Sequence, residues 1–381
     1  MRLIEADGKE LLRRRGLPVP RGVLHRSADG IAPPAGPVAV KAQILAGGRG
    51  KAGLVQLAAP ERVTAVAADI LGRMEAMGHT PGVLIEEQVA CETEWYLAWR
   101  IDDVRQCPVL MVSLSGGVEI ESNAASLREF AWDILRPLHP HHLLRFLADC
   151  GVTGRALGPT ARLAAEIYRV LIAEDAELIE INPLAVLATG QVMALDAKVT
   201  LDDNARFRHR EWRELLSHGI ERAALTPLER QATENDFTFV ELEGSVALFA
   251  GGAGFGMAIV DLLADAGLPP ANFADATGGS GAKAFAAVAD VVLGRAAQPD
   301  VKAVVFFQTM SATSLKFAVD GLIDAIDRTG FAKPLVVGFA ASAVAQREMT
   351  ADAALALFTA RGHHAIGDLD ELVPTLRKLM A

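Results

Sequence analysis

The sequence predicts an α/β protein of two domains, the second of which is an open, doubly wound parallel sheet. A chain of 381 residues is too long for one ordinary hydrophobic core. In its second half, short and nearly continuous apolar runs are each followed by a stretch with helical spacing: SVALFAGGAG, VKAVVFFQTM and PLVVGFAA. Buried parallel strands that alternate with helices give this pattern. The first half mixes strands and helices without regular repetition.

The N-terminal half is expected to begin with a helix. Residues 3–15 have amphipathic spacing, and Gly16 with the prolines that follow should end this helix. A Pro/Gly-rich passage then leads into a strand that carries Lys41. Helical periodicity returns in ERVTAVAADILGRMEAMG, and strand patterns follow in PGVLIEEQVA and ETEWYLAWRID.

A polar, proline-containing segment over residues 226–243 predicts the domain boundary. We therefore expect domains over residues 1–235 and 240–381. Ligands of doubly wound sheets lie at the carboxyl ends of the strands. This rule directs attention to the loops that follow residues 250, 276, 308 and 340.

Composition indicates a packed protein whose basic sites are local. The chain is 51% hydrophobic and 22% charged, which is typical of a folded domain. Its net charge of -10 argues against nucleic acid and anionic membrane as partners. The three cysteines form no CxxC pair, and we find neither a signal core nor an apolar run of bilayer length. These features predict a cytoplasmic protein.

The stretch VAVKAQILAGGRGKAGLVQLA places a lysine on a strand and then opens into a glycine-rich turn. Such a turn lets backbone N–H groups close on an anion, because no Cβ atom stands in the way. Lys41, Arg49 and Lys51 add positive charge, so a polyphosphate is the predicted ligand. The chain contains no GxxxxGK[ST] motif, which excludes a P-loop.

The stretch ELIEINPLAVLATGQVMALDAKV reads as a hairpin, in which Glu180 and Asn182 share one face. If its loop is the three residues 188–190, with the glycine left-handed, Asn182 lies opposite Asp196 on that face. A two-residue loop would put them on opposite faces. The first register gathers oxygen ligands that suit Mg²⁺ bridging to phosphates. The alternative is the solvated face of an ordinary hairpin.

Two further carboxylates, Glu86 and Glu94, lie at or beside the ends of strand patterns. Acceptors of this kind could bind the amine and hydroxyl donors of an adenosine. Surface ion pairs are the more common fate of such residues.

Four motifs in this order resemble the β subunits of the ADP-forming acyl-CoA synthetases, such as succinyl-CoA synthetase: KAQILAGGRGKAG, IEINPL, ALDAKVTLDDNARFRH and ANFADATGG. The resemblance covers most of the chain. It implies an ATP-grasp domain, in which two α/β subdomains grip ATP, followed by a flavodoxin-like ligase domain. It also implies the reversible conversion of a small carboxylic acid, CoA and ATP into acyl-CoA, ADP and phosphate.

In this family the reaction runs through an acyl phosphate and a phosphohistidine. The histidine and the CoA site belong to a partner α subunit, so the resemblance implies a heterodimer or an α2β2 heterotetramer. It implies that Asn182 and Asp196 hold Mg²⁺ and that Glu180 faces the phosphohistidine as a catalytic residue. The nucleotide would be bound by Lys41, Gly48, Arg49, Gly50, Glu86 and Glu94.

The second half departs from the family pattern at the expected acid site. Gly251 stands where the family usually has asparagine, Met310 and Ser311 replace two glycines, and Ser314 replaces an arginine. These four positions are the predicted substrate contacts, although the hydroxyls could serve only to cap a helix. Succinate or malate is the family expectation, and the departures equally allow another acid.

Two other functions compete with this interpretation. GGAGFG at residues 251–256 follows a strand and precedes a helix, with Asp275 roughly 20 residues on, as an NAD(P)-dependent oxidoreductase requires. The altered 309–316 loop also allows a non-catalytic homologue that only senses nucleotides.

Overall fold

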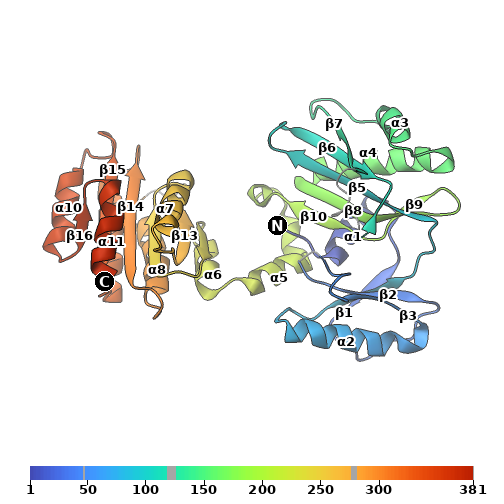
Figure 1. Ribbon diagram of the computed structural model, residues 1–381, viewed down its shortest axis with the longest axis horizontal. Helices are drawn as coiled ribbons and strands as arrows, with labels where there is room; N and C mark the ends of the chain where they lie inside the picture. Colours follow the sequence, from blue (N-terminus) through green and yellow to red (C-terminus); the bar gives the residue numbers. More distant parts are fainter. Residues whose placement is uncertain (46–47, 118–125, 276–280, 381) are drawn as a thin grey trace. The chain divides into compact units, whose positions relative to one another are not determined.

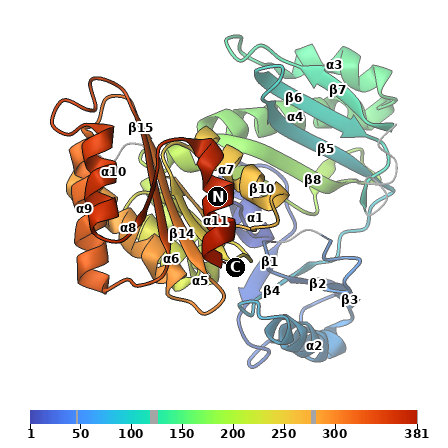
Figure 2. The same cartoon turned by 60° about the vertical axis from the view of Figure 1, so that its left-hand side comes forward.

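The computed structural model of the chain is shown in Figures 1 and 2. It describes residues 1–45, 48–117, 126–275 and 281–380. The chain divides into two compact units, Met1–Ala223 and Ala224–Ala381. The division precedes the polar 226–243 segment because α6 (Pro227–Glu234) packs within the second unit, with Ala232 in its core. No helix among the described residues is long and apolar enough to cross a membrane.

The first sheet of the N-terminal unit has four antiparallel strands in the order β1-β4-β2-β3. The strands are β1 (Gly22–His25), β2 (Val38–Ala42), β3 (Val55–Ala58) and β4 (Val83–Glu87). Helix α2 (Val63–Ala76) covers one face, as Figure 1 shows, and packs its apolar side chains onto β2 and β4. Every residue of β2 is buried, which places Lys41 inside the unit.

The second sheet follows the order β10-β8-β5-β6-β7, and β9 pairs with β8. Its strands are β5 (Thr93–Asp102), β6 (Cys107–Ser113), β7 (Arg128–Ala131), β8 (Ala176–Val186), β9 (Val192–Ala194) and β10 (Lys198–Leu201). Two helices, α3 (Pro140–Asp149) and α4 (Leu157–Ala173), pack on it. Trp99 of β5 anchors this core against Tyr168 of α4, with ring centroids 5.0 Å apart.

Helix α1 (Glu5–Arg14) joins the two sheets. Just before it, the Leu3 N–H donates to the carbonyl of Val199 on β10, 2.9 Å away. The Ala6 N–H donates to the side-chain oxygen of Gln43, just beyond β2, at 2.8 Å. The short helix α5 (Leu216–Ala224) adds a third anchor, because Ser217 donates to the buried carboxylate of Asp7. The first helix is therefore fixed from several sides.

The hairpin between β8 and β9 has the three-residue loop that places Asn182 opposite Asp196. The Leu187 N–H donates to the Gln191 carbonyl at 2.9 Å, which leaves Ala188–Gly190 as the loop. Gly190 has a φ of +81°, as the left-handed position requires. Leu184 pairs with Ala194 and Glu180 with Lys198, so the same register brings residue 182 opposite 196. The structure therefore has the first of the two registers that the sequence left open.

The C-terminal unit is a parallel, doubly wound sheet, as predicted. Its strands run in the order β12-β14-β15-β16: β12 (Val246–Ala250), β14 (Ala303–Met310), β15 (Leu335–Ala341) and β16 (His364–Ile366). A separate antiparallel pair joins β11 (Thr238–Glu241) to β13 (Asn272–Asp275).

Helices cover both faces of this sheet, as Figure 2 shows. Side chains of α8 (Ala282–Ala296), α9 (Leu315–Thr329) and α10 (Ala351–Ala360) build one core. Those of α7 (Ala253–Asp265) and α11 (Leu372–Met380) build the other. The strands are apolar on both sides because neither face meets water.

Gly190→Ala tests the hairpin register. A Cβ atom there would lie 2.4 Å from the Cβ of Arg155, in addition to the positive φ. We expect the free energy of unfolding to fall by roughly 2–4 kcal/mol, measured by chemical denaturation. Gly72→Ala on α2 is the control, because a Cβ atom added there would meet nothing within 4 Å. Equal stability of the two variants would contradict the tight turn.

Candidate functional site

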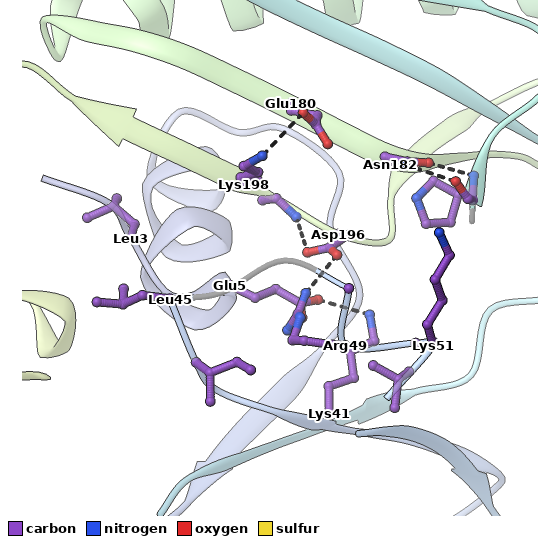
Figure 3. Close-up of a pocket in the computed structure, with 17 residues that line it drawn as sticks. Leu3, Glu5, Lys41, Leu45, Arg49, Lys51, Glu180, Asn182, Asp196 and Lys198 are labelled. Carbon is purple, nitrogen blue, oxygen red and sulfur yellow. Dashed lines mark hydrogen bonds and ion pairs between the residues drawn. The ribbon is translucent and has the colours of Figure 1, made fainter. Parts of the chain in front are cut away.

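A hollow of about 300 Å³ opens in the N-terminal unit and gathers most of the predicted site residues. Lys41 reaches it from β2, and the glycine turn after β2 contributes Gly48, Arg49 and Gly50. Glu180 and Asn182 of β8 and Asp196, between β9 and β10, line the other side (Figure 3). Strands far apart in the sequence thus bring cationic and oxygen-bearing groups to one cavity.

Four basic side chains line the hollow, Lys41, Arg49, Lys51 and Lys198, and carboxylates hold the first two in place. The Lys41 ammonium lies 2.9 Å from Glu5 and 2.5 Å from Glu86. The Arg49 guanidinium donates through Nη1 to Glu5, 2.6 Å away, and through Nη2 to Asp196, 2.7 Å away (Figure 3). Burial by itself lowers the pKa of Lys41. The negative charges of Glu5, Glu86 and Asp196 raise it by more than burial lowers it, so the pKa of Lys41 lies above its ordinary value. Both groups therefore carry their positive charge at neutral pH.

Glu5 and Lys9 complete a buried ion-pair network. The Lys9 ammonium lies 2.7 Å from Glu5 and 2.6 Å from Glu86. It also donates to the Leu195 carbonyl, as does Lys41. Burial raises the pKa of Glu5, but Lys9, Lys41 and Arg49 outweigh that effect and hold its pKa well below the usual range. The network contains three cations, Lys9, Lys41 and Arg49, and three carboxylates, Glu5, Glu86 and Asp196.

The sequence did not reveal Glu5 and Lys9 as parts of the site. They are one helical turn apart, which is the spacing of an ordinary surface ion pair. Only 3% of Glu5 and 1% of Lys9 is exposed. One feature of the sequence could have indicated their burial: Glu5 and Lys9 lie on the same side of the helix as its buried leucines.

Asn182 and Asp196 provide an oxygen pair that fits a hard cation. The Asn182 side-chain oxygen accepts from the Gly117 N–H, and its amide donates to the Gly117 carbonyl at 3.2 Å. Asp196 accepts from the Ala197 N–H at 2.7 Å and from Arg49. Both residues line the hollow, and each side-chain oxygen can accept more than one bond. The donor set therefore suits Mg²⁺, provided that Arg49 moves off Asp196.

Glu180 faces the same hollow and is held from two sides. The Lys198 ammonium lies 3.8 Å from its carboxylate, and the Tyr96 hydroxyl is hydrogen-bonded to it. Burial, together with the negative charge of Glu180, raises the pKa of Tyr96. Tyr96 therefore remains a neutral hydroxyl donor, which fixes the direction in which Glu180 points.

Glu86 and Glu94 lie apart from the main hollow. Glu86 is buried behind Lys9 and Lys41, and with Pro20 it lines a second hollow of about 160 Å³. Glu94 is exposed, and its carboxylate lies 3.9 Å from the Cys91 sulfur. Their contact with an adenosine stays a prediction.

The predicted acid-site positions lie at the carboxyl ends of β12 and β14. A Cβ atom on Gly251 would lie 2.8 Å from the Thr309 nitrogen and 2.9 Å from the Gln308 side-chain oxygen. The Thr309 hydroxyl also donates to the Gly251 carbonyl at 2.6 Å. An asparagine therefore cannot replace Gly251 without moving β14. The loop after residue 275 includes 276–280, which lie outside the described residues.

The loop before α9 is bound to the loop after β15. Ser342 donates through its hydroxyl to the Ser311 carbonyl and through its N–H to the Met310 carbonyl. The Ser314 hydroxyl donates to Glu348 at 2.8 Å, and the Leu315 N–H donates to the Ala345 carbonyl at 2.9 Å. The Glu348 carboxylate thus lies beside residue 314, the position of the family arginine.

Acid unfolding tests the charge state of Glu5. Because its folded pKa is depressed, its stabilising contribution is present above the unfolded value of about 4.3 and is lost as the pH falls further. We expect the free energy of unfolding to fall more steeply below pH 4 in the wild type than in Glu5→Gln, measured by urea titrations at each pH. Exposed Glu166→Gln on α4 is the control. Parallel curves for Glu5→Gln and the wild type would refute the buried charge.

The chain is similar to known proteins over most of its length. Residues 2–186 match the ATP-grasp domain family. The succinate–CoA ligase [ADP-forming] subunit β of Rubrobacter xylanophilus is 37% identical, over 88% of this chain and 88% of the relative. The corresponding subunit of Chlorobaculum parvum is 34% identical, over 95% and 96%.

A solved structure of ATP citrate lyase from Methanothrix soehngenii, in complex with citrate and coenzyme A, has a similar fold. It covers 99% of both chains with a TM-score of 0.76 at 18% sequence identity. The GGAGFG turn joins β12 to α7, but the relatives of the whole chain are ligases rather than oxidoreductases. The chain therefore belongs to the family of the β subunits of ADP-forming succinate–CoA ligases, and it combines an ATP-grasp domain with a doubly wound ligase domain.

Proposed function

We propose that this chain is the nucleotide-binding subunit of an ADP-forming acid–CoA ligase. The reaction converts a carboxylic acid, CoA and ATP into acyl-CoA, ADP and phosphate. An α-type partner supplies the CoA site and the histidine that carries the phosphoryl group, in a heterodimer or an α2β2 assembly. We place the enzyme in the cytoplasm, in keeping with its three free cysteines.

The observation that carries this proposal is the pairing of two kinds of group across one hollow. Lys41 and Arg49 place positive charge beside the phosphate oxygens, and Asn182 with Asp196 offers the oxygens that Mg²⁺ prefers. Phosphoryl transfer needs mainly positioning and electrostatic stabilisation of its charged transition state. When bound, Mg²⁺ would neutralise negative charge on the phosphates.

The protein groups then have distinct tasks. Lys41 and Arg49 bind and orient the phosphates, and the N–H groups of the glycine turn close on them. Arg49 exchanges Asp196 for a phosphate oxygen, which makes Asp196 available as a metal ligand. Glu180, oriented by Tyr96, faces the position to which the partner's histidine must come.

We further propose that the acid carries no second carboxylate. Ser314, in the position of the family arginine, donates to the Glu348 carboxylate. At residue 314 a second carboxylate would meet the negative charge of Glu348 in place of the family arginine, at a cost that grows as water is excluded. The space beside Gly251 is filled by Gln308 and Thr309. Monocarboxylic acids fit this arrangement better than succinate.

Ligand binding and turnover test the proposed function together. A ligand that binds only the folded state raises its stability. We expect Mg-ATP, and not NAD, to raise the Tm of the purified chain. Co-expressed with an α subunit of this family, the enzyme should turn over acetate or propionate at least tenfold faster than succinate, measured by CoA consumption.

The outcomes are separable. A Tm shift with NAD alone would refute the ligase. Mg-ATP binding without turnover of any acid by the assembled enzyme would favour the nucleotide-sensing homologue. Succinate as the best acid would refute only the assignment of the acid.

Asp196→Ala tests the metal site. We expect Mg²⁺ to lose most of its effect on ATP affinity, because one of two protein ligands is removed. The fold should persist, because 29% of the Asp196 side chain is exposed. Calorimetric titration of ATP with and without Mg²⁺ measures the effect, and Asp149→Ala on the exposed face of α3 is the control. Unchanged dependence on Mg²⁺ would rule out Asp196 as a ligand.

A further inference from the structure

We propose that Glu5 is a positioning residue that holds the two phosphate-binding cations at a fixed spacing. This inference rests on the proposed function. It assigns a role to the start of helix α1, which belongs neither to the glycine turn nor to the predicted metal ligands Asn182 and Asp196. Among the described residues, Glu5 is the one carboxylate that contacts all three cations of this network. The distances are 2.7 Å to Lys9, 2.9 Å to Lys41 and 2.6 Å to Arg49.

The two oxygens of Glu5 divide the cations between them. Oε1 lies against the ammonium groups of Lys9 and Lys41, and Oε2 accepts from Arg49. Lys41 comes from a strand and Arg49 from the glycine-rich turn, so one carboxylate sets the distance between them. A glutamine could not do the same, because its amide nitrogen would face one of the cations.

The backbone around Glu5 is itself fixed. The Leu3 N–H pairs with β10, the Ile4 N–H donates to the Ser217 hydroxyl at 2.8 Å, and the Ala6 N–H donates to Gln43. Only 1% of the Glu5 side chain is exposed. A carboxylate held in this way is preorganised and does not need to move when ligand arrives.

The arrangement explains how Arg49 can release Asp196 without leaving the site. Its Nη1 is bound to Glu5 and the Ala42 carbonyl, at 2.6 and 3.1 Å, whereas its Nη2 is bound to Asp196. If Asp196 turns to a metal, the Nη2 side becomes available to a phosphate oxygen. Glu5 remains bound to Nη1 throughout and acts as the pivot.

Lys41 keeps its position in the same way. Its ammonium has three donors, and its partners are Glu5, Glu86 and the Leu195 carbonyl. Without Glu5, Lys41 would keep only Glu86 and the Leu195 carbonyl, and Arg49 only Asp196 and the Ala42 carbonyl. No single group would then link the two cations and set their spacing.

The test compares Glu5→Gln with wild type for a ligand with phosphates and one without. Calorimetry measures Mg-ATP, and ligand-observed NMR measures adenosine. We expect the Kd for Mg-ATP to rise at least tenfold in the variant and the Kd for adenosine to change less than twofold. A purely structural role would weaken both ligands in parallel. Glu166→Gln on α4, an exposed helical glutamate paired with Arg169, should change neither.

A second variant keeps the test valid if Glu5→Gln does not fold. Glu5→Gln/Lys9→Met removes one negative and one positive buried charge together, which limits the loss of stability. Its Kd for Mg-ATP should still rise at least tenfold. Unchanged or tighter Mg-ATP binding in either folded variant, or a parallel loss of adenosine, would overturn the positioning role. Failure of the wild type to bind Mg-ATP would instead refute the proposed function.

Discussion

The N-terminal unit depends on one buried carboxylate surrounded by three cations. Removing charges from water is costly unless they are paired and hydrogen-bonded, so the partners of Glu5 must be in place when the unit folds. Those partners come from α1, β2 and the glycine turn, and Glu86 of β4 binds two of the same cations. The first helix is therefore part of the site, and the two sheets cannot close around the hollow without it.

The hairpin and the parallel sheet could be predicted because their signals are local. Alternation along β8 put Glu180 and Asn182 on one face, and a glycine could take the left-handed position of a three-residue loop. The sequence left the loop length open between two and three residues, and the structure decided for the three-residue loop that places Asp196 opposite Asn182. In the second half, short runs of apolar residues are each followed by a segment with helical spacing. This alternation predicts central parallel strands that are covered on both faces.

The sequence could not predict which charged residues are buried, because burial depends on chain segments that are distant in sequence. Glu5 and Lys9 have the spacing of a solvent-exposed pair, and only the approach of β2, β4 and Leu195 encloses them. Gly251 was a similar case. Its difference from the family suggested a lost contact, yet Gln308 and Thr309 of β14 fill the space that a side chain would need.

The equal number of opposite charges in the network has a consequence for selectivity. Lys9, Lys41 and Arg49 are already matched by Glu5, Glu86 and Asp196, so these three cations offer a free inorganic anion little unpaired charge, and Lys51, Lys198 and Glu180 are the other charged groups among the described residues of the hollow. An incoming anion gains full use of Arg49 only if Asp196 receives a substitute countercharge. A ligand that brings its own divalent cation supplies that substitute. Under the proposed function, this exchange of counter-ions would favour a metal-complexed polyphosphate over inorganic phosphate or sulfate.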